Sequence, residues 1–168
     1  MSLESVRAAF ESLQLELTII ELGASTATVD LAARAIGVEP GRIAKTLAFR
    51  LSDHRVILLV ARGDARIDNR KFKDVFGRGK MLPAEEVAGV TGHPVGGVCP
   101  FGLRTPLPVF LDVSLRDFDE VFPAAGSVSS AVRMTPQQIA QITQAQWVDV
   151  CQPVTLHTLQ CQALDAPG

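Results

Sequence analysis

The fold is decided by the stretch Ala44-Lys45-Thr46-Leu47-Ala48-Phe49-Arg50-Leu51, then Ser52-Asp53-His54, then Arg55-Val56-Ile57-Leu58-Leu59-Val60-Ala61-Arg62. The first segment alternates as a strand does, and the last has a continuous aliphatic centre of the kind found in buried strands. The three polar residues between them are typical of a turn. The stretch therefore predicts a β-hairpin in the middle of the chain.

Helix and strand patterns lie on both sides of this hairpin without regular alternation. Helices are expected over about residues 3–14, from 26 or 28 to 36, and over 69–76, 83–89 and 135–142. Strands are expected over 18–22, 109–113, 130–134 and 147–150, with a short turn or helix over 118–122. This mixture predicts an α+β fold with a strongly curved or barrel-like sheet surrounded by helices.

Length and composition are those of one globular domain. The 168 residues contain no linker long enough to divide domains, so we expect one domain over 1–152 and a C-terminal tail over 153–168. No apolar run has the ~18 residues that span a bilayer, and the first residues do not resemble a signal peptide. Three cysteines are too few for a disulfide framework. We expect a cytoplasmic protein without membrane contact.

Positive charge is concentrated in one part of the chain. Residues 42–80 contain eleven basic and four acidic residues, although the whole chain has a net charge of −2. Such segregation favours a polyanionic partner such as RNA, unless folding spreads these charges over several faces. The residues that we expect to contact the polyanion are Arg62, Arg66, Arg70, Lys71, Lys73, Arg78 and Lys80.

Lys45 is the first candidate for chemistry. In the predicted strand it shares a face with Leu47, Phe49 and Leu51. An ammonium among apolar side chains is costly to bury, so it either offers a cation to a phosphate, a carboxylate or a developing negative charge, or turns outward to solvent.

The second candidate is the loop His93-Pro94-Val95-Gly96-Gly97-Val98-Cys99-Pro100-Phe101-Gly102. Its glycines leave backbone N–H groups uncovered and its prolines stiffen the turn, which suits binding of a carbonyl oxygen or a phosphate. An ordinary connection is the alternative. Cys99 with His93 forms either a thiol nucleophile or a packing pair.

Other kinds of site are not indicated. No His or Cys pair has zinc-ligand spacing, and the nucleotide-binding glycine motifs are absent, so we expect neither a metal nor a cofactor. Asp112 lies in an apolar strand, where it either contacts the lysine or the loop backbone, or ends the strand as a turn former.

Five motifs together resemble the YbaK/EbsC family, which is related to the editing domain of bacterial prolyl-tRNA synthetase. The resemblance covers about residues 3–150. It rests on Ile43-Ala44-Lys45-Thr46-Leu47, the segment Val95 to Gly102, Phe110-Leu111-Asp112, Ala124-Ala125-Gly126-Ser127 and Arg133-Met134-Thr135-Pro136. It implies a curved sheet with surrounding helices, and metal-free hydrolysis, in trans, of the ester between a wrong amino acid and the 3′-terminal adenosine of a tRNA.

The resemblance also assigns site residues. It implies that Lys45, Gly96, Gly97 and Pro100 carry catalysis, with Lys45 near the terminal nucleotide and the loop amides on the carbonyl or the water. The implied substrate-binding residues are Thr46, His93, Val98, Cys99, Phe101, Gly102, Asp112, Gly126 and Ser127. Val128-Ser129 replaces the Pro-Asn that many such relatives have after Gly-Ser, which leaves the contacts of that loop open.

We therefore expect a trans-editing aminoacyl-tRNA deacylase that removes a small amino acid such as Ala, Cys, Ser or Thr, from tRNA-Pro or a similar tRNA. A synthetase is a further possible partner. Two alternatives stay open: a non-catalytic RNA- or nucleotide-binding module, and a Cys99-dependent hydrolase of small esters.

Overall fold

The computed structural model describes residues 2–153, so the expected tail lies outside the described residues from 154 onward. The helices are α1 (Ser2–Ser12), α2 (Val29–Ile36), α3 (Asn69–Phe76), α4 (Ala84–Thr91) and α5 (Pro136–Thr143). The strands are β1 (Ile19–Glu21), β2 (Ile43–Leu51), β3 (Val56–Arg62), β4 (Gly79–Met81), β5 (Val109–Asp112), β6 (Phe122–Pro123), β7 (Ser130–Val132) and β8 (Gln146–Val148). None of the described helices is long and apolar enough to cross a membrane.

The main sheet is mixed and open. Its strand order is β4-β2-β3-β5-β8, with β6 paired to β2 beside β4, while β1 and β7 form a separate two-stranded sheet. The α+β expectation is confirmed. The barrel-like expectation is not, because in the described part of the chain the end strands β4 and β8 do not pair with each other.

The predicted hairpin forms the centre of the sheet. β2 and β3 pair antiparallel from Ala44↔Arg62 to Arg50↔Val56, and Ser52 to His54 make the turn. The two faces of β2 enter different cores, as strand alternation requires. Phe49 and Leu51 pack with Phe72 of α3, whereas Ala44 and Ala48 join the larger core on the other face.

Three helices lie close to where the sequence predicts them, and each begins at a side-chain cap. The Thr28 side chain caps α2 and the Asp68 carboxylate caps α3, while Thr135 and Gln138 form a capping box at α5. The turn or helix expected over 118–122 was misplaced: a 3₁₀ helix occupies Val113–Asp117 and β6 begins at Phe122. β4 was not predicted because three exposed residues starting at a glycine carry no strand signal.

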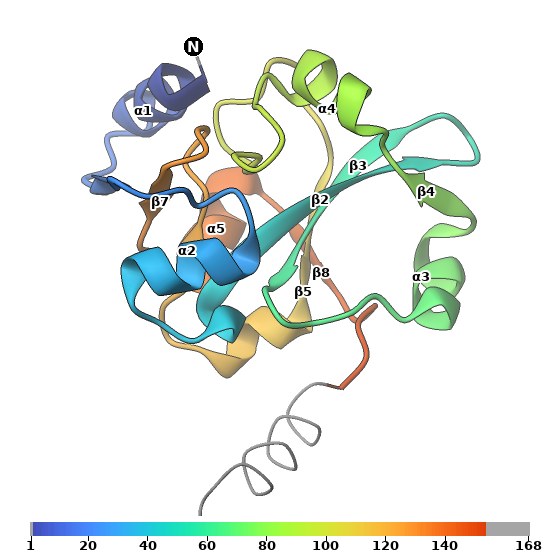
Figure 1. The fold of residues 1–168 in the computed structure, drawn as a ribbon. Coiled ribbons are helices and arrows are strands. Elements are labelled where there is room, and N and C mark those ends of the chain that lie inside the picture. Colours follow the sequence, from blue (N-terminus) through green and yellow to red (C-terminus); the bar gives the residue numbers. More distant parts are fainter. Residues whose placement is uncertain (1, 154–168) are drawn as a thin grey trace, which may run out of the picture.

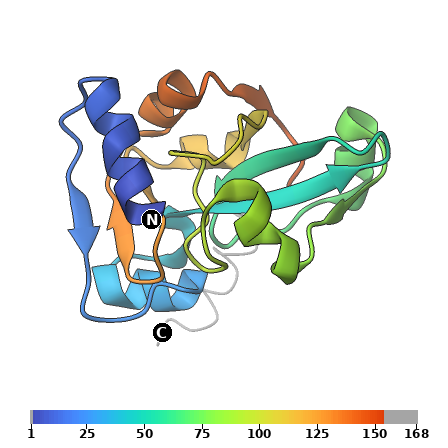
Figure 2. The ribbon, with the colours of Figure 1, turned by 90° about the horizontal axis from the view of Figure 1, so that it is seen from above.

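Helices gather at both ends of the β2–β3 hairpin. Figures 1 and 2 show α1, α2 and β7 towards one end of the β2–β3 hairpin and α3 towards the other. The Gly/Pro segment 92–107 connects α4 to β5. This arrangement places that segment beside β2, where the candidate site lies.

Candidate functional site

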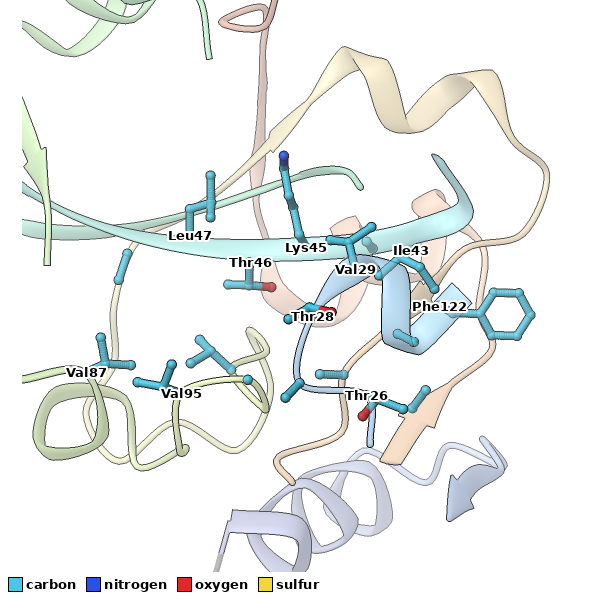
Figure 3. A pocket seen from close by; sticks show the side chains of 18 of the residues that line it. Thr26, Thr28, Val29, Ile43, Lys45, Thr46, Leu47, Val87, Val95 and Phe122 are labelled. Carbon is cyan, nitrogen blue, oxygen red and sulfur yellow. The ribbon is translucent and has the colours of Figure 1, made fainter. Parts of the chain in front are cut away.

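A cavity of about 330 Å³ lies against one edge of β2. Its walls come from β2, from the segment that enters α2, from the Gly/Pro loop and from β6–β7 (Figure 3). The lining is largely apolar with a few hydroxyl groups. The residues that line it include Thr26, Ala27, Thr28, Val29, Ile43, Lys45, Thr46, Val95, Gly96, Val98, Phe122 and Ser130.

Thr46 presents unpaired polar groups to this cavity. Its hydroxyl oxygen Oγ1 is buried and has no hydrogen-bond partner within residues 2–153. The Ala48 carbonyl accepts from Leu82 N at 2.9 Å, so it points away from β3. The main-chain groups of Thr46, two residues earlier in the strand, point to the same edge of β2. β6 pairs this edge at residues 43–44 and β4 pairs it at residues 49–51, so Thr46 lies in the gap between them.

The Gly/Pro loop supplies backbone donors from the opposite wall. The Gly97 N–H is used within the loop, where it donates to the Pro94 carbonyl at 2.9 Å. The N–H groups of Gly96 and Val98 find no acceptor in the described part of the chain, and both residues line the cavity. The loop therefore offers amides, as its composition predicts, through these two residues and not through Gly97.

Gly97 instead joins two loops. A Cβ at this position would lie 2.8 Å from the backbone N, C and O atoms of Ser127. The Gly126 N–H donates to the Gly97 carbonyl at 3.1 Å, and Ser127 Oγ donates to Ser130 Oγ at 2.7 Å. Gly126 and Ser127 thus hold the Gly/Pro loop in place. Neither residue lines the cavity, but Ser127 binds Ser130, which does.

The second half of the loop is packed inside the protein. His93, Cys99, Pro100 and Phe101 are buried and do not line the cavity, and Gly102 packs against the backbone of Ser5 in α1. His93 Nε2 lies 2.6 Å from the Phe101 carbonyl, which fixes the ring, and burial lowers the pKa of His93. A neutral His93 therefore donates from Nε2 to this carbonyl.

This packing corrects the nucleophile hypothesis for Cys99. The Cys99 side chain is fully buried, and burial raises the pKa of its thiol to about 12. Its Sγ lies 3.6 Å from His93 Nε2, but that nitrogen already faces the Phe101 carbonyl. A protonated thiol without solvent contact is a packing group, not a nucleophile.

The Lys45 side chain leaves β2 on the face opposite to Thr46 (Figure 3). Lys45 and Gly96 line the same cavity, yet the ammonium Nζ donates to the Ala65 carbonyl. Burial lowers the pKa of Lys45, and this effect outweighs the opposing influence of Cys151 and Asp64. The ammonium is thus held beside the segment that follows β3, not among the loop amides.

Asp112 has a structural position. The carboxylate is buried and accepts from Val150 N at 2.8 Å and from Ser114 N at 2.9 Å, so it ties the end of β5 to the chain after β8 and caps the 3₁₀ helix. It does not line the cavity. These bonds fit the role of Asp112 as a turn former at the end of the strand, and its contact with a substrate stays a prediction.

The basic residues expected to contact a polyanion have different surroundings. Arg62 is only 6% exposed and its guanidinium binds Asp64 and Asp117, while Lys71 binds Asp149 and the Cys151 carbonyl. Arg66 and Arg70 are exposed. Lys73, Arg78 and Lys80 line a second cavity.

Sequence reasoning missed several cavity walls. Thr26, Thr28 and Ser130 line the cavity, although the sequence places them only at the start of a helix and in a strand. Their hydroxyl groups are the feature of the sequence that could have marked them as residues of a polar site. Nothing in the sequence pattern shows that the residues before α2 and those of β7 meet beside β2.

Comparisons with known proteins identify the family of this chain. Residues 24–142 match the model of the family described as aminoacyl-tRNA editing domain. The chain is 49% identical over 153 residues to the uncharacterized protein YwhH of Bacillus subtilis, covering 90% of this chain and 98% of that protein. It is 26% identical over 120 residues to EbsC of Enterococcus faecalis, named as a candidate Cys-tRNA(Pro)/Cys-tRNA(Cys) deacylase, covering 70% and 73% of the two chains.

A solved structure shows the same fold. It is described as a candidate trans-editing enzyme for prolyl tRNA synthetase, and superimposes with a TM-score of 0.83 at 36% identity, covering 90% of this chain and 98% of the other. The family match spans most of the chain and includes β2, the Gly/Pro loop and β7. The chain therefore belongs to the aminoacyl-tRNA editing domain family.

Proposed function

We propose that this protein hydrolyses, in trans, the ester that joins a wrongly attached small amino acid to the 3′-terminal adenosine of a tRNA, with tRNA-Pro or a similar tRNA as substrate. One observation carries the proposal. In a chain of the editing family, Gly96 and Val98, whose amides are unpaired, and Thr46, whose hydroxyl is unpaired, line the same cavity.

The chemistry suits these groups. Hydrolysis adds the oxygen of water, or first that of a neighbouring ribose hydroxyl, to the carbonyl carbon, and the leaving ribose oxygen takes up a proton. Oriented amides stabilise the negative charge that develops on the carbonyl oxygen. An aminoacyl ester is already activated, so donors and a positioned attacking group suffice without a strong side-chain base.

The lining of the cavity suits a small amino acid of low polarity. Its walls include the apolar residues Val29, Ile43 and Phe122 and the hydroxyl groups of Thr46 and Ser130. In this proposal Ala, Cys, Ser or Thr binds against these walls, and rejection of larger side chains there acts as the second sieve of editing.

In this proposal Lys45 binds the terminal nucleotide of the tRNA. Its ammonium lies on the far side of β2 from Thr46 (Figure 3), where it binds the Ala65 carbonyl. When the substrate binds, it leaves that carbonyl and supports the terminal nucleotide by its phosphate. We expect Lys45→Ala to abolish most deacylation while leaving the melting temperature nearly unchanged, since the substitution removes a costly buried charge.

The decisive experiment is a deacylation screen with the purified protein and tRNAs charged with Ala, Ser, Thr, Cys and Pro. We expect release of at least one small amino acid, and its loss in Lys45→Ala. Full activity in Cys99→Ala is expected because that thiol is buried. Salt-sensitive tRNA binding without any ester cleavage would instead make this a non-catalytic RNA-binding module.

A further inference from the structure

A second cavity, of about 650 Å³, lies next to the first. The two share one wall, the segment 81–84, which connects β4 to α4. Leu82 and Ala84 line the first cavity, Pro83 lines the second, and Met81 lines both. The Met81 side chain is 58% exposed, so it forms an accessible apolar ridge between the two.

The second cavity combines an apolar floor with a positive rim. Leu51 and Phe72 contribute buried side chains to the floor. Lys73, Arg78 and Lys80 contribute cations that form no ion pair within residues 2–153, whereas Arg50 in the wall is bound to Glu86. This is the combination that a nucleotide requires, because its base is flat and apolar on its faces and its phosphate is an anion.

The floor is open because Gly79 has no side chain. A Cβ there would approach Leu51 Cδ2 and Phe72 Cε1 to 3.0 Å and would cover both. Gly79 lies between Arg78 and Lys80 in sequence. Arg78 and Lys80, which form no ion pair within residues 2–153, therefore lie beside an uncovered apolar surface, and Lys80 directly precedes Met81 of the ridge.

We propose that the second cavity binds an unpaired ribonucleotide of the RNA strand that leads to the esterified nucleotide. Its base packs on Met81 and the floor, and its phosphates meet Arg78, Lys80 and Lys73. The proposal rests on the proposed function, since the ester then lies in the first cavity and the preceding nucleotide crosses the Met81 ridge. It assigns these three cations to a single strand and not to the duplex stem.

The direct test uses the trinucleotide 5′-ACC-3′ and the methionine methyl resonances. The chain has three methionines; Met81 is exposed and Met134 is buried, so Met134 serves as an internal control. We expect the trinucleotide to shift the Met81 methyl resonance and not that of Met134. Lys80→Ala should weaken binding about fivefold or more, because single-strand binding combines charge with stacking. Arg34→Ala, which removes an exposed arginine of α2 outside both cavities, should change it less than twofold.

An unshifted Met81 methyl, unchanged affinity in Lys80→Ala, or equal competition by a blunt RNA duplex would overturn the proposal. A second substrate separates it from the proposed function. 3′-O-alanyl-adenosine lacks any preceding nucleotide and needs the first cavity alone. If this ester is hydrolysed but the trinucleotide does not bind, the nucleotide site in the second cavity is overturned and the proposed deacylase function stands. If the trinucleotide binds but no charged substrate is hydrolysed, the proposed function is overturned and the nucleotide site stands.

Discussion

The two cavities on either side of the 81–84 segment differ in what their walls offer. The first is the smaller, and the ammonium of its lining residue Lys45 is bound to the Ala65 carbonyl, so its unpaired polar groups are the Thr46 hydroxyl and the Gly96 and Val98 amides. The second is larger and is rimmed by Lys73, Arg78 and Lys80. Fixed dipoles act only at short range and in one direction, whereas cations attract a polyanion from a distance and are screened by salt. Changes in the first cavity should therefore alter turnover, and changes in the second should alter binding.

The largest effect should come from Gly97→Ala, which presses a Cβ to 2.8 Å from the Ser127 backbone and forces the two loops apart. Displacing the Gly96 and Val98 amides by about 1 Å should lower kcat on the order of 100-fold. Single-turnover deacylation of a charged tRNA measures this. Gly89→Ala in α4 is the matched control, because its Cβ would meet nothing within 4 Å and kcat should not change. Equal kcat in both variants would contradict the proposed role of the loop.

The next effect should come from Thr46→Val, which keeps the shape of the side chain and removes the unpaired hydroxyl. We expect kcat/KM to fall about 10-fold, the value of a hydrogen bond of roughly 1.4 kcal/mol to the substrate. The melting temperature should stay or rise, since a buried unpaired oxygen is lost. Thr105→Val, at an exposed position, is the control. Unchanged kcat/KM would show that Thr46 only shapes the wall.

A smaller effect, of a different kind, should follow from the double change Arg78→Ala and Lys80→Ala. KM for charged tRNA should rise several-fold while kcat stays, and the plot of log affinity against log salt should become shallower by about 0.7 for each lost contact to single-stranded RNA. The measurement is a salt titration of tRNA binding, with Arg34→Ala as control. A fall in kcat without a change in KM would erase the distinction between the two cavities.

The smallest effect should be seen with pH. Burial lowers the pKa of His93 below its ordinary value of 6.5, so the unfolded chain binds a proton more readily than the folded one. The stability linked to His93 is therefore fully present above pH 6.5 and is lost as the pH falls through that value towards the folded pKa. We expect acidification from pH 7.5 to 5 to lower the melting temperature by a few degrees more in the wild type than in His93→Gln. His54→Asn, at an exposed position with φ 71°, should follow the wild type.

Much of the fold could be predicted because its signals are local. The hairpin, the caps at Thr28, Asp68 and Thr135, and the buried strand before Asp112 all follow from residues that are close in sequence. The errors occurred where the signal is non-local. β4 and β6 are short strands that exist because β2 offers them an edge, and sheet closure depends on how the last strands are placed.

The candidate site divides in the same way. Alternation along β2 correctly placed Lys45 on the face of Leu47 and Phe49, but it could not show that Thr46, on the other face, would be the residue aimed at the cavity. The glycine content of the loop predicted available amides. Which ones are free depends on the turn to Pro94 and on the contact with Ser127, which join residues that the sequence keeps apart.

By itself the sequence determined the family, the central hairpin, the amide-rich loop and the basic segment. Each of these depends on the types of residues that lie close together in the chain. Only the tertiary structure decided that Arg62 and Lys71 are bound to carboxylates, that Cys99 is enclosed, and that Lys73, Arg78 and Lys80 surround one cavity. The physical reason is that burial and charge pairing are properties of neighbours in space, and these neighbours come from distant parts of the chain.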